Sequence, residues 1–172
     1  DLRQILKNTR QTALYVTHDQ EEAFVIADKL AVMGNGRVHQ VGQPQQVYLR
    51  PSSAFVARFL GLNNLLPAEA IHTRNQSFLL LPFGKVPYLH HTSGKGLALL
   101  RPDQVVIDEL APYQLIGVVS RRIFRGNTCQ AVVSVEGAFL QFVFPANACL
   151  PAEAESVKIG FDPQLALQFY PQ

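Results

Sequence analysis

The residues with the clearest potential for chemistry surround His18, in the segment Thr-His-Asp-Gln at residues 17–20. The apolar residues 13–17 are rich in strand formers and predict a buried strand. The stripe that follows, with apolar residues from Ala23 to Leu30 at helical intervals, predicts an amphipathic helix. An imidazole between a strand and a helix N-terminus lies where an anion is favoured, because the first backbone N–H groups of a helix are unpaired. A histidine that only ends a strand is the alternative interpretation of these residues alone.

The start of the expected helix has two possible caps. Thr17 and Gln20 have the spacing of a capping box, and so do Asp19 and Glu22. For Asp19, the role of helix cap is favoured over a role in contacts with another protein. Glu21 and Glu22 are expected to be solvated side chains favoured by the helix dipole, rather than paired catalytic acids.

Four other histidines are candidates for metal ligands, and none is assigned to a metal site. His90 and His91 are adjacent, so in a strand they point to opposite faces, which is poor geometry for holding one ion. No Cys, Asp or Glu lies close in sequence to complete a site. His39 and His72 are isolated along the chain and are expected to be structural.

Basic and aromatic residues gather before the Gly126-Asn127 turn, where Arg121, Arg122 and Arg125 flank Phe124. Such a group on a small barrel can bind an oxyanion or single-stranded nucleic acid. Alternation places Arg122 on the face opposite the other two arginines, and the net charge of residues 63–172 is zero. A solvated strand end is therefore the favoured interpretation, and no nucleic-acid partner is expected.

The elements that must position these residues divide the chain into two parts, 1–62 and 63–172. In the first part, Asn35-Gly36 between two apolar runs predicts a β-hairpin. Pro44 suits the first position of a short helix at residues 43–49. A second helix is expected after a serine cap at Ser52 or Ser53 and before Gly61.

The second part is predicted to be all-β, because many short strands with turn formers at regular intervals suggest a small barrel of the OB type. The expected strands are residues 77–81, 96–101, 104–107, 115–124, 130–135, 139–144 and 157–161.

Composition excludes several classes of protein. The chain has 172 residues, 48% of them hydrophobic, which is enough for a packed core and rules out disorder along its whole length. No apolar run approaches the roughly 18 to 20 residues of a membrane span. Cys129 and Cys149 are too few for a disulfide framework or a zinc site, and both are expected to be buried in a reducing compartment.

Residues 15–23, Tyr-Val-Thr-His-Asp-Gln-Glu-Glu-Ala, resemble the segment that follows the Walker B and D-loop region in ATP-binding cassette (ABC) ATPases. The importer ATPases of the maltose, polyamine, sulfate and ferric-iron group are similar to this chain at residues 27–33, 36–42, 44–48, 50–51 and 55–61. The second part resembles their TOBE domain, an OB-like fold, at Leu-Arg-Pro-Asp (100–103), Phe-Arg-Gly-Asn (124–127) and Ile-Gly-Phe-Asp-Pro (159–163). The junction at 61–67 looks closest to that of ferric-iron-type or related anion importers.

The resemblance implies an α+β chain. Residues 1–62 correspond to the C-terminal part of an α/β ABC cassette, and residues 63–172 to an OB-like TOBE barrel that serves regulation or dimerisation. The intact subunit is expected to hydrolyse ATP with Mg²⁺ and so power solute uptake at the cytoplasmic face of the cell membrane. Its expected partners are transmembrane permease subunits and a second copy of the ATPase. The resemblance implies that His18 is the catalytic switch histidine, which contacts the γ-phosphate and helps to place the attacking water.

One departure from the family bears on activity. The chain has no G-x-x-x-x-G-K-[ST] loop, no Ser-Gly-Gly-Gln signature and no apolar strand ending in Asp-Glu before His18. We therefore expect a C-terminal piece of a longer subunit that is inactive by itself, with no cofactor-binding residue of its own. It is expected to self-associate, because side chains such as Leu14 and Val16 would pack on the missing part of the cassette sheet and are otherwise left uncovered. The alternative is a stand-alone oxyanion-binding or dimerisation module, against which residues 1–62 argue.

Overall fold

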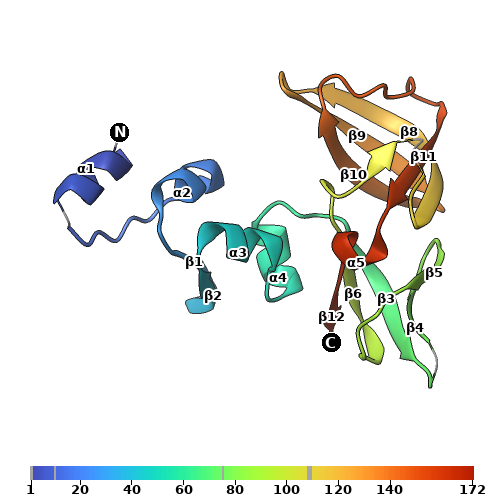
Figure 1. The fold of residues 1–172 in the computed structure, drawn as a ribbon, viewed down its shortest axis with the longest axis horizontal. Coiled ribbons are helices and arrows are strands. Elements are labelled where there is room, and N and C mark those ends of the chain that lie inside the picture. Colours follow the sequence, from blue (N-terminus) through green and yellow to red (C-terminus); the bar gives the residue numbers. More distant parts are fainter. Residues whose placement is uncertain (1, 10, 75, 108–109) are drawn as a thin grey trace. The chain divides into compact units, whose positions relative to one another are not determined.

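The chain forms two compact units in a computed structural model that describes residues 2–9, 11–74, 76–107 and 110–172. Unit 1 is Asp1–Gly61 and unit 2 is Leu62–Gln172. The helices of the first unit and the strands of the second are distinct in Figure 1. No helix within the described ranges is both long and apolar enough to span a membrane.

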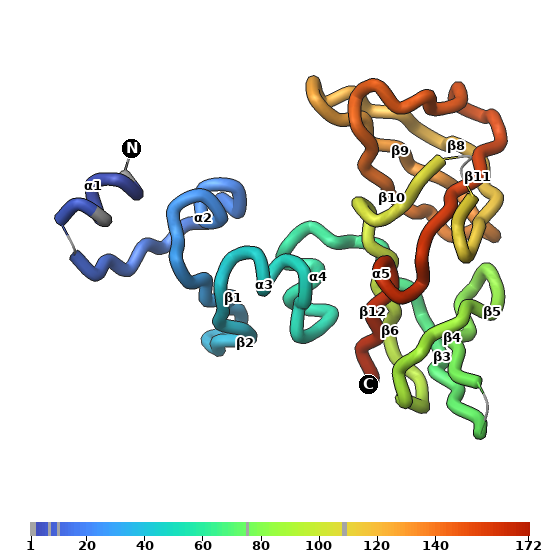
Figure 2. Tube along the Cα trace, in the orientation of Figure 1, coloured from blue at the N-terminus to red at the C-terminus, as the bar shows by residue number. Residues whose placement is uncertain are grey.

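The described residues of unit 1 form four short helices and one hairpin. Its elements are α1 (Leu2–Thr9), α2 (Gln20–Ile26), β1 (Leu30–Gly34), β2 (Arg37–Gly42), α3 (Pro44–Leu49) and α4 (Ala54–Phe59). The path from α1 to α4 can be followed in the tube of Figure 2.

The buried strand expected at residues 13–17 is absent. The segment has no regular secondary structure, and the side chains of Leu14 and Val16 are 94% and 86% exposed. The sequence pattern was that of a strand covered on both faces, but a strand forms only where another strand supplies hydrogen bonds. No strand of the described residues pairs with this segment, and the prediction of a buried strand is wrong for this structure.

The hairpin and the two following helices form as expected. Asn35 and Gly36 adopt φ values of 50° and 70°, the left-handed conformation that a two-residue hairpin turn requires. Pro44 stands in the first turn of α3, and the Ser53 hydroxyl caps α4 by accepting a hydrogen bond from the Val56 N–H at 3.3 Å. Gly61 follows α4 with φ of 75°, a conformation that glycine adopts without strain.

In unit 2, the described residues form two antiparallel sheets of five strands each. The order in the first sheet is β12-β6-β3-β4-β5, and in the second it is β10-β9-β8-β11-β7. The strands are β3 (Leu65–His72), β4 (Ser77–Leu81), β5 (Gly84–Pro87), β6 (Gly94–Leu100), β7 (Val106–Ile107), β8 (Tyr113–Phe124), β9 (Thr128–Val135), β10 (Ala138–Pro145), β11 (Ser156–Phe161) and β12 (Leu167–Pro171), with the one-turn helix α5 (Pro163–Ala166) before the last.

The seven predicted strands are all present, and three further strands were missed. β3 contains Pro67 and Glu69, β5 has only four residues, and β12 ends in proline, so each gave a weak strand pattern. The strands of the described residues pair into two sheets, whereas a single barrel was expected. Pairings across long sequence separations decide this arrangement, and alternation within one strand does not encode them.

One hydrophobic core joins the two sheets of unit 2. Ala98 and Leu100 from β6 and Leu79 from β4 share it with Phe142 from β10 and Ile159 from β11. All five side chains are fully buried. The alternating burial along β9 places every second residue in this core, as expected of a sheet with one face covered.

Candidate functional site

His18 is an exposed residue in the bend immediately before the N-cap of α2. No hydrogen bond or ion pair to its ring occurs within the described part of the chain. The imidazole is therefore accessible to a ligand.

The start of α2 is capped by Asp19. Its carboxylate Oδ1 accepts a hydrogen bond from the Glu22 N–H at 3.1 Å, which decides between the two caps that the sequence allowed. The helix itself has only seven residues and ends at Ile26. The stripe expected to reach Leu30 is therefore cut short, because Ala27 is already extended and Leu30 belongs to β1. An anion at this helix end would compete with the Asp19 carboxylate.

The Glu22 carboxylate ties the segment before α2 to the helix. Thr17 donates its hydroxyl to Glu22 Oε2 at 2.9 Å, and the Asp19 N–H donates to the Thr17 hydroxyl at 3.0 Å. A hydrogen bond to the same carboxylate raises the pKa of the exposed Tyr15 phenol. These contacts fix the backbone on both sides of His18. Glu22 thus has a structural role that the sequence interpretation, a solvated side chain, missed.

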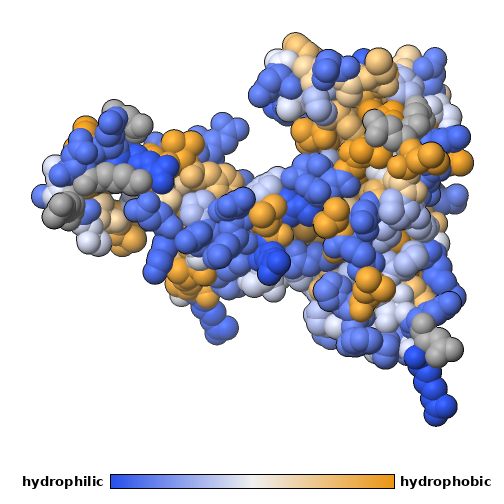
Figure 3. All heavy atoms as spheres, viewed as in Figure 1, coloured by the Kyte–Doolittle hydropathy of each residue, from blue (hydrophilic) through white to orange (hydrophobic). Residues whose placement is uncertain are grey.

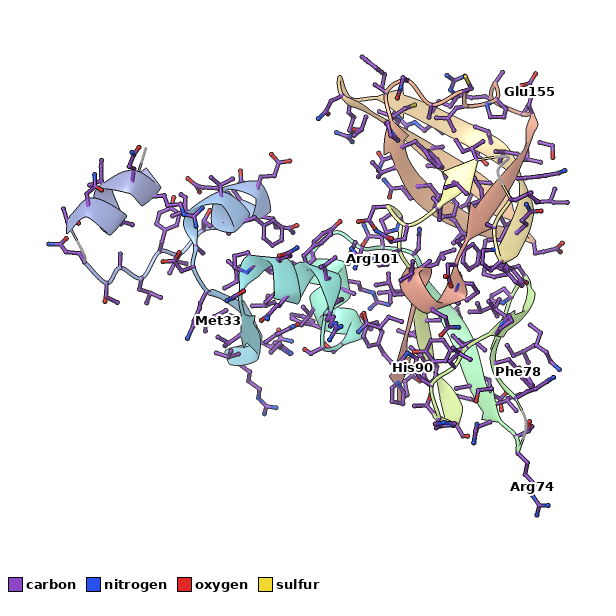
Figure 4. The ribbon with its side chains drawn as sticks, in the orientation of Figure 1. Met33, Arg74, Phe78, His90, Arg101 and Glu155 are labelled. Carbon is purple, nitrogen blue, oxygen red and sulfur yellow. The ribbon has the colours of Figure 1, made fainter. Side chains whose placement is uncertain are left out.

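In the second unit, the Leu-Arg-Pro-Asp segment at residues 100–103 has a structural role. In the Leu-Arg-Pro-Asp piece, Arg101 is buried and its guanidinium makes two contacts of 3.2 Å with the Asp103 carboxylate. Figure 4 shows Arg101 beyond the end of β6, close to α5, and its backbone N–H donates to the Ala166 carbonyl of that helix at 2.8 Å. A buried guanidinium needs such a partner, because an unpaired buried charge is costly.

The arginines near the Gly126-Asn127 turn do not gather into a site. Arg121, Arg122 and Arg125 are all exposed, and β8 has a register shift between Val119 and Arg121. The guanidinium of Arg122 donates to the Pro151 carbonyl at 3.2 Å, which holds it to the chain before β11. Phe124 is exposed as well. Among the described residues this is a strand end with solvated charges.

The histidines give an arrangement that the sequence did not show. His90 lies against Tyr88, with ring centroids 4.8 Å apart, whereas His91 contacts the ring of His72 at 4.6 Å. His72 is isolated along the chain but meets His91 in the structure, because the end of β3 and the β5–β6 connection lie at the same end of the sheet. Cys149 is also exposed, contrary to expectation, whereas Cys129 is buried.

Asn64, at the start of unit 2, is a second residue that sequence reasoning missed. Its buried side chain pairs with the backbone of Gln141 in β10: the Asn64 amide donates to the Gln141 carbonyl, and the Gln141 N–H donates to Asn64 Oδ1, both at 2.7 Å. The Asn64 side chain thus pairs with backbone groups of the edge strand β10, as a neighbouring strand would do. The Asn-Asn pair at 63–64 gave no signal beyond a loop.

A known protein family matches part of the second unit. Residues 98–169, from β6 to β12, match the TOBE domain family. Unit 2 is therefore similar to a TOBE domain over these residues.

Comparison with individual proteins extends along nearly the whole chain. The chain is 32% identical over 174 residues to the spermidine/putrescine import ATP-binding protein PotA of Ruegeria pomeroyi, covering 96% of this chain and 48% of that protein. It is 36% identical over 163 residues to the Fe(3+) ions import ATP-binding protein FbpC of Streptomyces coelicolor, covering 94% of this chain and 45% of that protein. The chain thus spans about half the length of these relatives. The resemblance to importer ATP-binding subunits is confirmed, and so is the resemblance of residues 98–169 to a TOBE domain.

A solved structure also matches part of the chain. It is that of the cytoplasmic molybdate-binding protein ModG with molybdate bound, with a TM-score of 0.49 and 13% identity over 64% of this chain and 96% of that chain.

Proposed function

We propose that this chain is part of the ATP-hydrolysing subunit of an ABC importer, in which hydrolysis of ATP with Mg²⁺ drives solute uptake. The observation that carries the proposal is similarity to import ATP-binding proteins over 94–96% of the chain, including the segment around His18. Unit 1 would contribute the last part of the ATPase cassette. The TOBE domain of unit 2 would serve regulation or pairing of subunits. The subunit would work at the cytoplasmic face of the membrane against its permease partners.

Within that subunit we assign His18 as the switch histidine. Its exposed ring and the fixed backbone on both sides support this role, because a group that positions a γ-phosphate and a water must be accessible and held in place. The ring would donate a hydrogen bond to the transferred phosphoryl group. It would not contact the adenine, so nucleotide binding should survive its removal.

Replacement of His18 tests the proposal in the intact subunit. We expect His18→Ala to lower the ATPase rate at saturating ATP by about a hundredfold or more, the loss typical of removing one transition-state donor. The dissociation constant for MgATP should change little. His39→Ala is the matched control, since His39 is another exposed histidine of the same unit. A His18→Ala subunit with a near-normal ATPase rate would contradict the assignment.

For the second copy of the subunit, we propose contact through the outer face of the sheet that contains β8, β9 and β10. Val118, Ser134 and Phe139 are directly paired across these strands, so they share one face, and Ile116 lies on it two residues before Val118. Ile116 and Phe139 are 67% and 70% exposed. Apolar residues appear on the visible surface of this part of unit 2 in Figure 3. A two-fold contact would cover the same patch on both chains.

Light scattering on the chain and on the double variant Ile116→Ser/Phe139→Ser checks this contact. We expect the parent chain to form dimers at micromolar concentration and the variant to be monomeric. Leu165→Ser is the control, because Leu165 is 66% exposed on α5 and lies outside this face. If the double variant dimerises as well as the parent, the contact lies elsewhere, and the uncovered side chains of unit 1 become the next candidate.

A further inference from the structure

Three polar side-chain atoms converge where the sheet of β3, β4 and β6 ends. His72 is the last residue of β3, Ser77 opposite it is the first of β4, and His91 lies in the connection from β5 to β6. Nδ1 of His91 lies 3.4 Å from Nδ1 of His72, and the latter atom lies 2.7 Å from the Ser77 hydroxyl. The two imidazole rings meet edge to face, at 82°.

Short turns on both sides hold this arrangement in place. Directly after His72, the Thr73 N–H donates to the Gln76 carbonyl at 2.8 Å and closes the β3–β4 connection. The Thr92 N–H donates to the His90 carbonyl at 3.0 Å, which places His91 at the middle of a three-residue turn. Both histidines are thus presented by ordered backbone.

The connection that carries His91 is also anchored at its start. The Leu89 N–H donates to the Gln164 side chain of α5 at 3.3 Å, and the buried Tyr88 hydroxyl accepts a hydrogen bond from the Phe169 N–H of β12 at 3.2 Å. The ring of His90, labelled in Figure 4, contacts the Tyr88 ring. Arg74, the basic residue nearest in sequence, extends away from the tip of the β3–β4 connection.

Neither His72 nor His91 takes part in an ion pair within the described ranges. A neutral imidazole has a nitrogen lone pair, which is the form that binds metals.

We propose that His72 and His91 bind a divalent transition-metal ion of the zinc or nickel type through their Nδ1 atoms. Two nitrogen ligands at about 2.0–2.1 Å from a tetrahedral zinc ion lie roughly 3.3 Å apart, close to the distance that this pair already has. The ion displaces the hydrogen bond between Ser77 and His72, and water fills the remaining positions, since both histidines are exposed. Imidazole ligands select zinc, nickel or copper over magnesium and calcium.

Calorimetric titration of the whole chain with zinc chloride tests the site. The titration uses a Cys149→Ser background, because the exposed thiol of Cys149 is another zinc ligand. We expect one ion per chain, with affinity lowered at least about tenfold in His72→Gln and equally in His91→Gln. The double variant should lose no more than either single variant, because one ion needs both ligands at once. Magnesium chloride should give no binding.

His90→Gln is the matched control, and it should bind zinc as the parent does. Separate surface histidines would instead give small losses that add in the double variant. That additive pattern, an equal loss in His90→Gln, unchanged affinity in either ligand variant or no binding up to millimolar zinc would each overturn the proposal. Circular dichroism of each variant verifies that the sheets are intact.

Discussion

The two units differ in how much of their apolar surface they bury. Unit 1 buries a few side chains, chiefly Val32, Val47, Val56 and Leu60, and leaves Leu14 and other large apolar residues of the segment before α2 exposed. Unit 2 has one continuous core to which both of its sheets contribute. The unit with the most specific sequence motif is therefore the one that its own packing supports least. The His18 motif and the residues that stabilise the larger core therefore lie in different units.

The largest expected effect follows from truncating this core. Phe142→Ala should lower the free energy of unfolding of unit 2 by about 3–5 kcal/mol, because the fully buried ring leaves a cavity. Leu14→Ala, in the exposed segment of unit 1, should change the free energy of unfolding of unit 1 by less than about 0.5 kcal/mol. Urea unfolding followed by circular dichroism measures both. Comparable losses in the two variants would show that the contrast between the units is wrong.

An intermediate effect is expected at the first residues of unit 2. Asn64→Ala removes both hydrogen bonds to the Gln141 backbone and should cost roughly 2 kcal/mol, since a buried donor and acceptor lose their partners. Asn63→Ala is the control, because that side chain is exposed. Hydrogen exchange at the Gln141 N–H, read by NMR, should accelerate in the Asn64 variant alone. Unchanged exchange would mean that the amide does not secure β10.

The smallest effect at neutral pH is expected for Tyr170→Phe. The Tyr170 hydroxyl is buried and has no hydrogen-bond partner within the described ranges, so its removal should leave stability at pH 7 unchanged or slightly higher. Tyr88→Phe, by contrast, should cost about 1 kcal/mol, because the Phe169 N–H loses its acceptor. Thermal unfolding at pH 7 distinguishes the two.

Removal of the Tyr170 hydroxyl has a further consequence in alkali. Burial raises the pKa of Tyr170 above the ordinary value of 10.0. The folded chain therefore keeps the phenol neutral where the unfolded chain ionises it, so its contribution to stability is present below pH 10 and is lost as the pH rises through the folded-state pKa. Tyr170→Phe should shift the midpoint of alkaline unfolding to higher pH. A midpoint at or below that of the parent chain would contradict this assignment.

Local signals in the sequence were sufficient for many elements. The Asn35-Gly36 turn and the proline that begins α3 act within a few residues, so short patterns specify them. Each of the two helix caps was narrowed to two residues, and the structure selects Asp19 and Ser53. Alternating strands such as β9 were found for the same reason. The resemblance to importer subunits also came from contiguous residues, and the comparisons confirm it.

The sequence by itself determined the family resemblance, the hairpin and most strands, whereas the tertiary structure decided what meets across the chain. The segment 13–17 has a strand composition but no pairing strand among the described residues, so it remains irregular. His72 and His91, 19 residues apart, and Asn64 and Gln141, 77 apart, are joined only by the order of the strands. Contacts at such separations depend on which strands pair and in which register, and side-chain alternation specifies a strand's faces but not its neighbours.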